Sequence, residues 1–187
     1  PLVFLAEKDT NGNRPYVDVV TGEPTLKVSP VALNLGEQSF VTSFREYCKG
    51  HQDDVLAGKQ VYLLRNESKR GLGFFEANNF YPDFILWILD GEKQYITFID
   101  PKGIRNLKGL EDDKIQLFKY LQTEVSSQLG NNHLMLNSFI ISNTPMEQVE
   151  FWLKNPFEKG EFQKNHVLFK DDKGYLETMM NMILQYM

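Results

Sequence analysis

The chain has 187 residues, of which 42% are hydrophobic and 24% charged, and a formal net charge of −5 at pH 7. This composition is ordinary for a globular domain, and the negative charge disfavours a non-specific nucleic-acid coat, because phosphate binding uses Lys and Arg. A single cysteine excludes an internal disulfide framework and a Cys-rich metal site, and it favours a cytoplasmic location. No run of about 18 apolar residues predicts a membrane span, so we expect no membrane partner.

Residues 1–28 predict a β-rich N-terminal segment or linker, since an Asn11-Gly12 hairpin signal separates two runs typical of strands. The chain begins at Pro1 without an initiator Met, and we therefore expect it to be part of a longer protein. Residues 29–187 predict one mixed α/β domain with the element order α-β-β-β-α-β and later additions.

The first helix of this domain is predicted to open after Pro30, with apolar residues at helical spacing. The members of this stripe are Phe40, Val41, Phe44, Tyr47 and Cys48. At about 100° per residue, Glu37 falls inside the stripe, whereas Glu46 falls on the opposite side. We expect Glu37 to point towards the sheet; a first-turn Glu favoured by the helix dipole is the alternative interpretation.

A short strand is predicted over residues 61–66, and a hairpin follows a loop. The hairpin strands are predicted over residues 84–89 and 94–100, on either side of "DGEK". With a four-residue loop, Leu89 pairs with Gln94, and the same register sets Asp83 directly opposite Asp100. A two-residue turn is expected instead to pair Asp83 with Phe98 and to leave Asp100 diagonal on the same face.

Two ionised carboxylates in this position repel each other, and burial adds a desolvation cost. A shared proton, a lysine counter-ion or a divalent cation would relieve the repulsion, and Lys102 lies nominally on the same face. Because Mg²⁺ prefers carboxylate and water oxygens, we expect Asp83 and Asp100 to bind Mg²⁺ or Mn²⁺ with the Pro101 carbonyl. Lys102 would then orient a water or offset negative charge on a substrate. The alternative is a structural ion triad.

Here the chain resembles the PD-(D/E)XK nuclease superfamily, on Pro82-Asp83, an apolar strand, a hairpin and Asp100-Pro101-Lys102. It is similar, more narrowly, to the C-terminal nuclease domain of the type III restriction enzyme Res subunit. That likeness lies in "SPVALNLGEQSFV", "VYLLRN", "GFFEANNFYPDFILWI" and "QYITFIDPKG", and it covers most of residues 29–187. The resemblance implies a restriction-endonuclease-like αβββαβ core with a mixed central sheet flanked by helices.

The resemblance further implies a metal-dependent endonuclease that hydrolyses phosphodiester bonds in double-stranded DNA, leaving 5′-phosphate and 3′-hydroxyl ends. The implied partners are a helicase/translocase portion of the same parent chain and a methyltransferase (Mod) subunit. Members of the superfamily often add an active-site Glu from the first helix, for which Glu37 is the candidate. A non-catalytic nucleic-acid-binding or docking module with the same fold is the alternative, and an enzyme that uses the two acids for general acid–base chemistry is a third.

A second helix is predicted over residues 112–129. Its expected core stripe consists of Phe118, Leu121, Val125 and Leu129. Gln116 and Tyr120 lie on the far side with Lys119, and they match the Q-x-x-x-Y element of the RecB-like branch, which supports the active site or touches the DNA backbone. We expect Arg105 and Lys108, from the basic segment "KGIRNLKG", to hold the DNA backbone together with Lys119. Strands over 134–142 and 166–169, a helix in "TPMEQVEFWLKN" with Thr144 as its possible N-cap, and a closing helix over 174–187 complete the domain.

Overall fold

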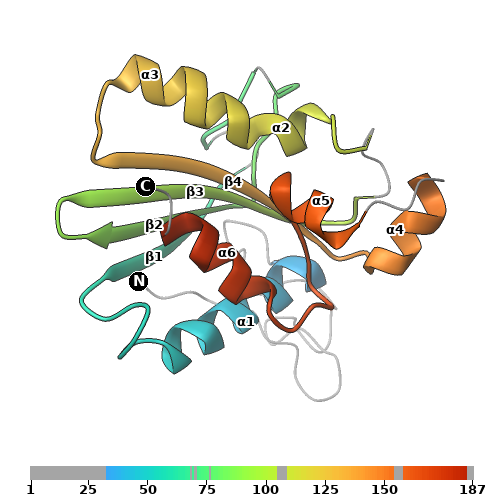
Figure 1. Cartoon of the computed structure of the whole chain (residues 1–187), viewed down its shortest axis with the longest axis horizontal. Coiled ribbons are helices and arrows are strands. Elements are labelled where there is room, and N and C mark those ends of the chain that lie inside the picture. The colour runs from blue at the N-terminus through green and yellow to red at the C-terminus, as the bar shows by residue number, and fades with distance from the viewer. Residues whose placement is uncertain are drawn as a thin grey trace, which may run out of the picture.

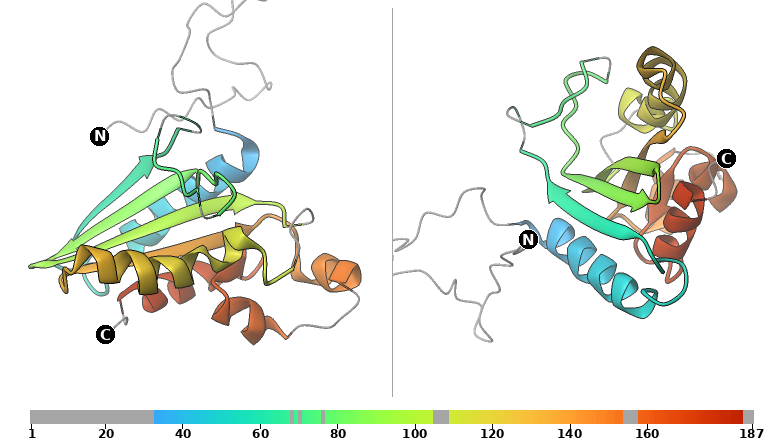
Figure 2. Two further views of the ribbon diagram at one scale, coloured as in Figure 1. Left: turned by 90° about the horizontal axis from the view of Figure 1, so that it is seen from above. Right: turned by 90° about the vertical axis from the view of Figure 1, so that its left-hand side faces the viewer.

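The computed structural model describes residues 33–67, 69, 71–75, 77–104, 109–153 and 158–184. These residues form an open five-stranded sheet with helices on both faces (Figures 1 and 2). The strands, in their order across the sheet, are β1 (Gln60–Arg65), β2 (Phe84–Asp90), β3 (Lys93–Lys102), β4 (Leu134–Ser142) and β5 (Val167–Phe169). β1 to β3 are antiparallel, whereas β3, β4 and β5 are parallel, so the sheet is mixed as predicted.

Two apolar cores lie on the two faces of the sheet. One face packs against α1 (Leu35–Gly50) and α6 (Tyr175–Leu184). The other packs against α2 (Asp113–Tyr120), with contributions from α4 (Met146–Leu153) and α5 (Lys159–Lys164). α5 was not predicted. None of the described helices is long and apolar enough to cross a membrane. The predicted segment 1–28 lies outside the described residues.

The first helix begins at Leu35, not directly after Pro30 as predicted. Asn34 is its N-cap, because the Asn34 side chain accepts a hydrogen bond from the backbone N–H of Glu37 at 2.9 Å. The Glu37 carboxylate accepts in return from the backbone N–H of Asn34 at 3.2 Å, which completes a capping box. The Asn-x-x-Glu spacing in the sequence is the signal for this start.

The β2–β3 hairpin has the predicted register, since Leu89 pairs with Gln94. The strands continue to the pair Asp90–Lys93, so the turn contains two residues rather than four. Gly91 occupies its first position at a φ of 58°, as a type II′ turn requires. The expectation that a two-residue turn would shift the register was therefore wrong, because extending both strands by one residue preserves the pairing.

The second helix contains a π-helical segment, Leu121–Val125, between α2 and α3 (Ser126–Leu129). Leu121 is buried as predicted, but Leu129 is 54% exposed, so the expected core stripe does not reach the end of the helix. The π turn explains this, because one extra residue rotates everything that follows by about 100°. The helix ends at Gly130, which has a φ of 58°.

His166, which directly precedes β5, is a buried core residue. Its ring lies nearly parallel to those of Phe118 and Phe139, with centroid distances of 3.9 and 4.6 Å. Its Nδ1 lies 3.1 Å from the carbonyl oxygen of Ser138. Burial lowers the pKa of His166 to about 4, so the imidazole is neutral in the folded protein at neutral pH.

We predict that acid destabilises the protein through His166. Between its ordinary pKa of about 6.5 and its folded value, only the unfolded state is protonated, so stability falls as the pH falls. The wild type should lose about 2 kcal/mol more than His166→Phe between pH 7 and pH 5. Urea unfolding of both proteins at both pH values measures this difference. Equal losses would contradict the assignment of a neutral, buried imidazole.

Candidate active site

Two aspartates meet at the end of the β2–β3 hairpin, away from its turn. Phe84 pairs with Ile99, so the same register places Asp83, the residue before β2, opposite Asp100. Asp100 is only 5% exposed, and a hydrogen bond joins the two carboxyl groups. Burial, then the charge of Asp100 and this hydrogen bond, raise the pKa of Asp83 to about 8. When no cation lies between Asp83 and Asp100, a shared proton thus reduces the repulsion between the two carboxyl groups.

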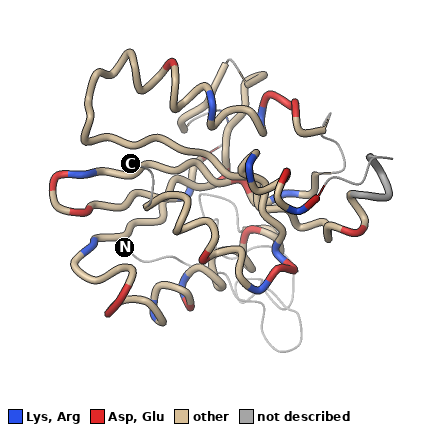
Figure 3. Tube along the Cα trace, viewed as in Figure 1, with Lys and Arg blue, Asp and Glu red and all other residues tan. Residues whose placement is uncertain are grey.

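Lys102 also reduces the repulsion between the two aspartates, because its ammonium group forms an ion pair with Asp100 Oδ2. Its Nζ also lies 4.4 Å from the centre of the Phe80 ring, which is within cation–π range. Charged residues cluster at the hairpin turn, in loops and on helices, and few lie within the strands (Figure 3). Asp100 and Lys102 are exceptions on β3, separated by the buried Pro101.

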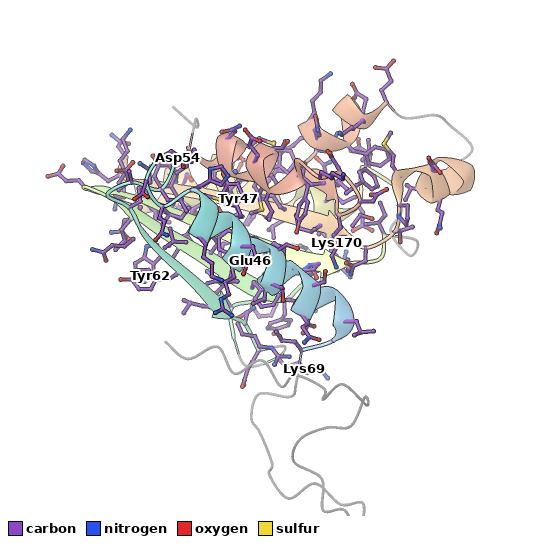
Figure 4. All side chains as sticks on the ribbon, turned by 90° about the horizontal axis from the view of Figure 1, so that it is seen from below. Glu46, Tyr47, Asp54, Tyr62, Lys69 and Lys170 are labelled. Carbon is purple, nitrogen blue, oxygen red and sulfur yellow. The ribbon has the colours of Figure 1, made fainter. Side chains whose placement is uncertain are left out.

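Glu37 points inward, as predicted, and is only 8% exposed, whereas Glu46 is exposed on the outer side of α1 (Figure 4). Its carboxylate accepts a hydrogen bond from the Asn34 side chain at 2.6 Å and lies 3.5 Å from Arg65 Nη2. Its charge also raises the pKa of Asp83. Glu37 therefore faces inward as predicted, and it also lies in the first turn of α1, where the helix dipole favours an acid, as the alternative interpretation holds. A catalytic role for Glu37 stays a prediction.

Asn66, which sequence reasoning missed, fixes the backbone that carries Asp83. Its backbone N–H donates to the Asp83 carbonyl, and its side-chain amide donates to the carbonyls of Pro82 and Leu72, all at 2.8 Å. Its side-chain oxygen accepts from the Leu72 N–H at 2.9 Å. An Asn directly after a strand and ahead of a glycine-containing loop is the weak signal that was available. Only the fold shows that this loop returns to the hairpin.

The loop before Asp83 also fixes the ring beneath Lys102. Phe74 and Phe80 exchange two backbone hydrogen bonds, at 2.8 and 3.0 Å, and so close the loop. Between them, Asn78 and Asn79 both have a positive φ, which Asn tolerates better than most residues. The Phe74 ring packs edge-on against Phe98, at a centroid distance of 4.7 Å. Phe80 is thereby held against the sheet face that carries the aspartates.

Gln116 and Tyr120 are both half-buried rather than placed on an open outer face. Gln116 Nε2 donates to the Leu110 carbonyl at 2.5 Å and to Asn165 Oδ1 at 3.0 Å, so it ties three segments together. Tyr120 packs against the core on the α2 face. Neither side chain makes a hydrogen bond to the aspartates among the described residues, and their supporting role stays a prediction. Lys119 is exposed on α2.

Arg105 and Lys108 fall outside the described residues. Within the described ranges, no three His, Cys, Asp or Glu side chains are grouped so as to hold a metal ion. The opposed carboxyls of Asp83 and Asp100 nevertheless fit a divalent cation, because an ion between them would replace repulsion with attraction. A metal would be held by these two groups, with oxygens such as the Pro101 carbonyl or water added.

We predict that Asp83→Asn stabilises the protein in EDTA, because it removes one of two opposed acids and retains the shape of the side chain. The folded state raises the pKa of Asp83, so wild-type stability is lost as the pH rises through about 8. The gain should therefore be larger at pH 8.5 than at pH 6. Thermal unfolding at both values tests this, with the exposed Asp53→Asn as the matched control. A lower melting temperature for Asp83→Asn would contradict the proximity of the acids.

We predict that Asn66→Ala destabilises the protein by about 1–3 kcal/mol, because it leaves the buried Pro82 carbonyl without its partner and removes two part-buried hydrogen bonds to Leu72. Denaturant unfolding measures the loss. Asn131→Ala is the control, since the exposed Asn131 side chain accepts a single hydrogen bond, from the His133 N–H. Equal effects of the two changes would show that the Asn66 contacts do not fix the loop.

Comparisons of this chain with family models, with curated proteins and with solved structures found no match. The geometry of the aspartates, Lys102 and their supports therefore stands without support from relatives.

Proposed function

We propose that this domain is a metal-dependent nuclease that hydrolyses phosphodiester bonds in DNA. The observation that carries the proposal is the opposed pair Asp83 and Asp100 with the Lys102 ammonium beside it. The order of elements, α1-β1-β2-β3-α2-β4, supports the finer proposal of a restriction-endonuclease-like core. Double-stranded DNA is the proposed substrate, and we extend the proposal to the cleavage module of a type III restriction enzyme.

The chain's own groups have distinct roles in this proposal. A bound Mg²⁺ or Mn²⁺ would supply a Lewis acid for the scissile phosphate and a more acidic water. Asp83 and Asp100 would hold that ion as carboxylates, and their shared proton would pass to solvent. Lys102 would be released from its ion pair with Asp100. Its ammonium group would then donate a hydrogen bond to the water or to the phosphate as negative charge develops. The Phe80 ring holds the ammonium close to the site during this exchange.

A purely structural ion triad explains the arrangement less well. One lysine compensates one carboxylate, and Lys102 is paired with Asp100. Lys102 also lowers the pKa of Asp83, but burial, Asp100 and Glu37 outweigh it and raise that pKa to about 8. A chain selected only for stability gains nothing from this second acid, because a neutral residue of similar size would avoid the penalty. A site that disfavours its own unliganded state is typical of function.

The proposed partners follow from the same nuclease assignment. A helicase/translocase portion of a longer parent chain would bring the domain to its substrate, and a methyltransferase (Mod) subunit would supply target recognition. Both are proposals that rest on the resemblance described above. The cytoplasm is the cellular location that agrees with this nuclease assignment.

We predict that the 187-residue chain cleaves plasmid DNA in Mg²⁺ or Mn²⁺, and that Asp83→Ala, Asp100→Ala and Lys102→Ala each lower the rate by about 100-fold or more. Agarose-gel assays of initial rates measure this. Asp53→Ala and Lys93→Ala, both exposed, should retain wild-type rates.

Undiminished cleavage by all three site variants would mean that the site is elsewhere. Tight DNA binding that is insensitive to Mg²⁺, without cleavage by the wild type, would instead favour a non-catalytic binding module. Removal of the metal by EDTA should abolish cleavage by the wild type.

A further inference from the structure

A second lysine converges on the ring that holds Lys102. Lys114 Nζ lies 5.7 Å from the centre of the Phe80 ring, and Lys102 Nζ lies 4.4 Å from the same point. The two nitrogens are therefore at most about 10 Å apart, the total of these two distances. Lys114 comes from the first turn of α2, so a second element brings a cation to the site.

The backbone of Lys114 is fixed by contacts of the two residues that precede it. The backbone N–H of Lys114 donates to the N-cap Asp112 Oδ1 at 3.0 Å. The side-chain amide of Asn78 donates to Asp113, which ties the first turn of α2 to the loop that ends at Phe80. The approach of Lys114 to the ring thus follows from how α2 and this loop are joined.

Helix stability does not account for a cation at this position. The helix dipole disfavours positive charge in the first turn, and Lys102 is a like charge facing the same ring. Among the described residues, no carboxylate lies within ion-pair distance of the Lys114 ammonium. An anion bound by both ammonium groups would relieve their mutual repulsion.

We propose that Lys114 binds a backbone phosphate of the DNA, next to the phosphate that Lys102 contacts. This inference rests on the proposed function and extends it to the path of the substrate strand. Phosphates of one strand follow each other at about 3.4 Å along the helix axis, so two cations within about 10 Å can contact neighbouring ones. Lys114 touches no reacting atom in this arrangement, and its contribution is to affinity rather than to the chemical step.

The test measures binding of the full 187-residue chain to a fluorescein-labelled 30-base-pair duplex in EDTA, over a series of salt concentrations. Lys114→Ala should weaken binding on the order of fivefold and reduce the slope of log K against log salt by about one. Lys114→Arg should keep the wild-type affinity, because it keeps the charge. In Mg²⁺, Lys114→Ala should raise KM several-fold and change kcat less than twofold.

Lys93→Ala is the matched control, since it removes one exposed lysine from the other end of β3, about 30 Å from Lys102. Equal affinity of Lys114→Ala and Lys93→Ala would overturn the inference, and so would absence of wild-type binding to the duplex. Wild-type binding without cleavage would overturn the proposed nuclease function alone. In that case a specific loss in Lys114→Ala would still support the phosphate contact.

Discussion

The antiparallel register of β2 and β3 forces two carboxyl groups of like charge together at the buried end of a hairpin. Every pair from Asp90–Lys93 to Phe84–Ile99 keeps this register, and the next pair along it is Asp83 and Asp100. A slip of one residue would exchange the side chains of a strand between the two cores, and the packing of both cores therefore resists any change of register. The repulsion between the acids is therefore imposed by the same packing that stabilises the sheet.

The surroundings of the pair limit this repulsion without removing it. Lys102 forms an ion pair with Asp100, and the pKa of Asp83 is raised to about 8, first by burial and then by Asp100, so Asp83 is mostly protonated at neutral pH. Asn66 holds the backbone on which Asp83 is mounted, so the two groups do not separate to escape each other. Such a site is organised before any ligand arrives, and a divalent cation would replace both the proton and the lysine.

The hairpin was predictable because its signal is local. Apolar residues in 84–89 and a turn at Gly91 set the strands, and simple counting then sets Asp83 opposite Asp100. The strand 134–142 was predicted with the bounds of β4 for the same reason. The start of α1 was wrong because the capping box of Asn34 was overlooked, although that signal is also local.

Other features could not be predicted because they depend on contacts between distant segments. The exposure of Leu129 follows from a π turn that the helical pattern does not encode. Gln116 bonds to Asn165, 49 positions away, and Asn66 bonds to Pro82 across a loop. Lys114 approaches Lys102 only because α2 returns to the edge of the site. The hydrophobic pattern of the sequence predicts which face of a helix or strand a residue lies on. Which of these faces contact each other depends on the packing of the whole domain.

The most direct test of the account is a crystal structure of the protein soaked in Mn²⁺, with the metal located by its anomalous scattering. We predict one strong peak between the carboxylates of Asp83 and Asp100, with ligand oxygens at roughly 2.0–2.2 Å from the metal. The Lys102 ammonium should move away from Asp100, towards the Phe80 ring. The proposed metal site would be contradicted if Mn²⁺ bound elsewhere or not at all, and if Lys102 stayed paired with Asp100.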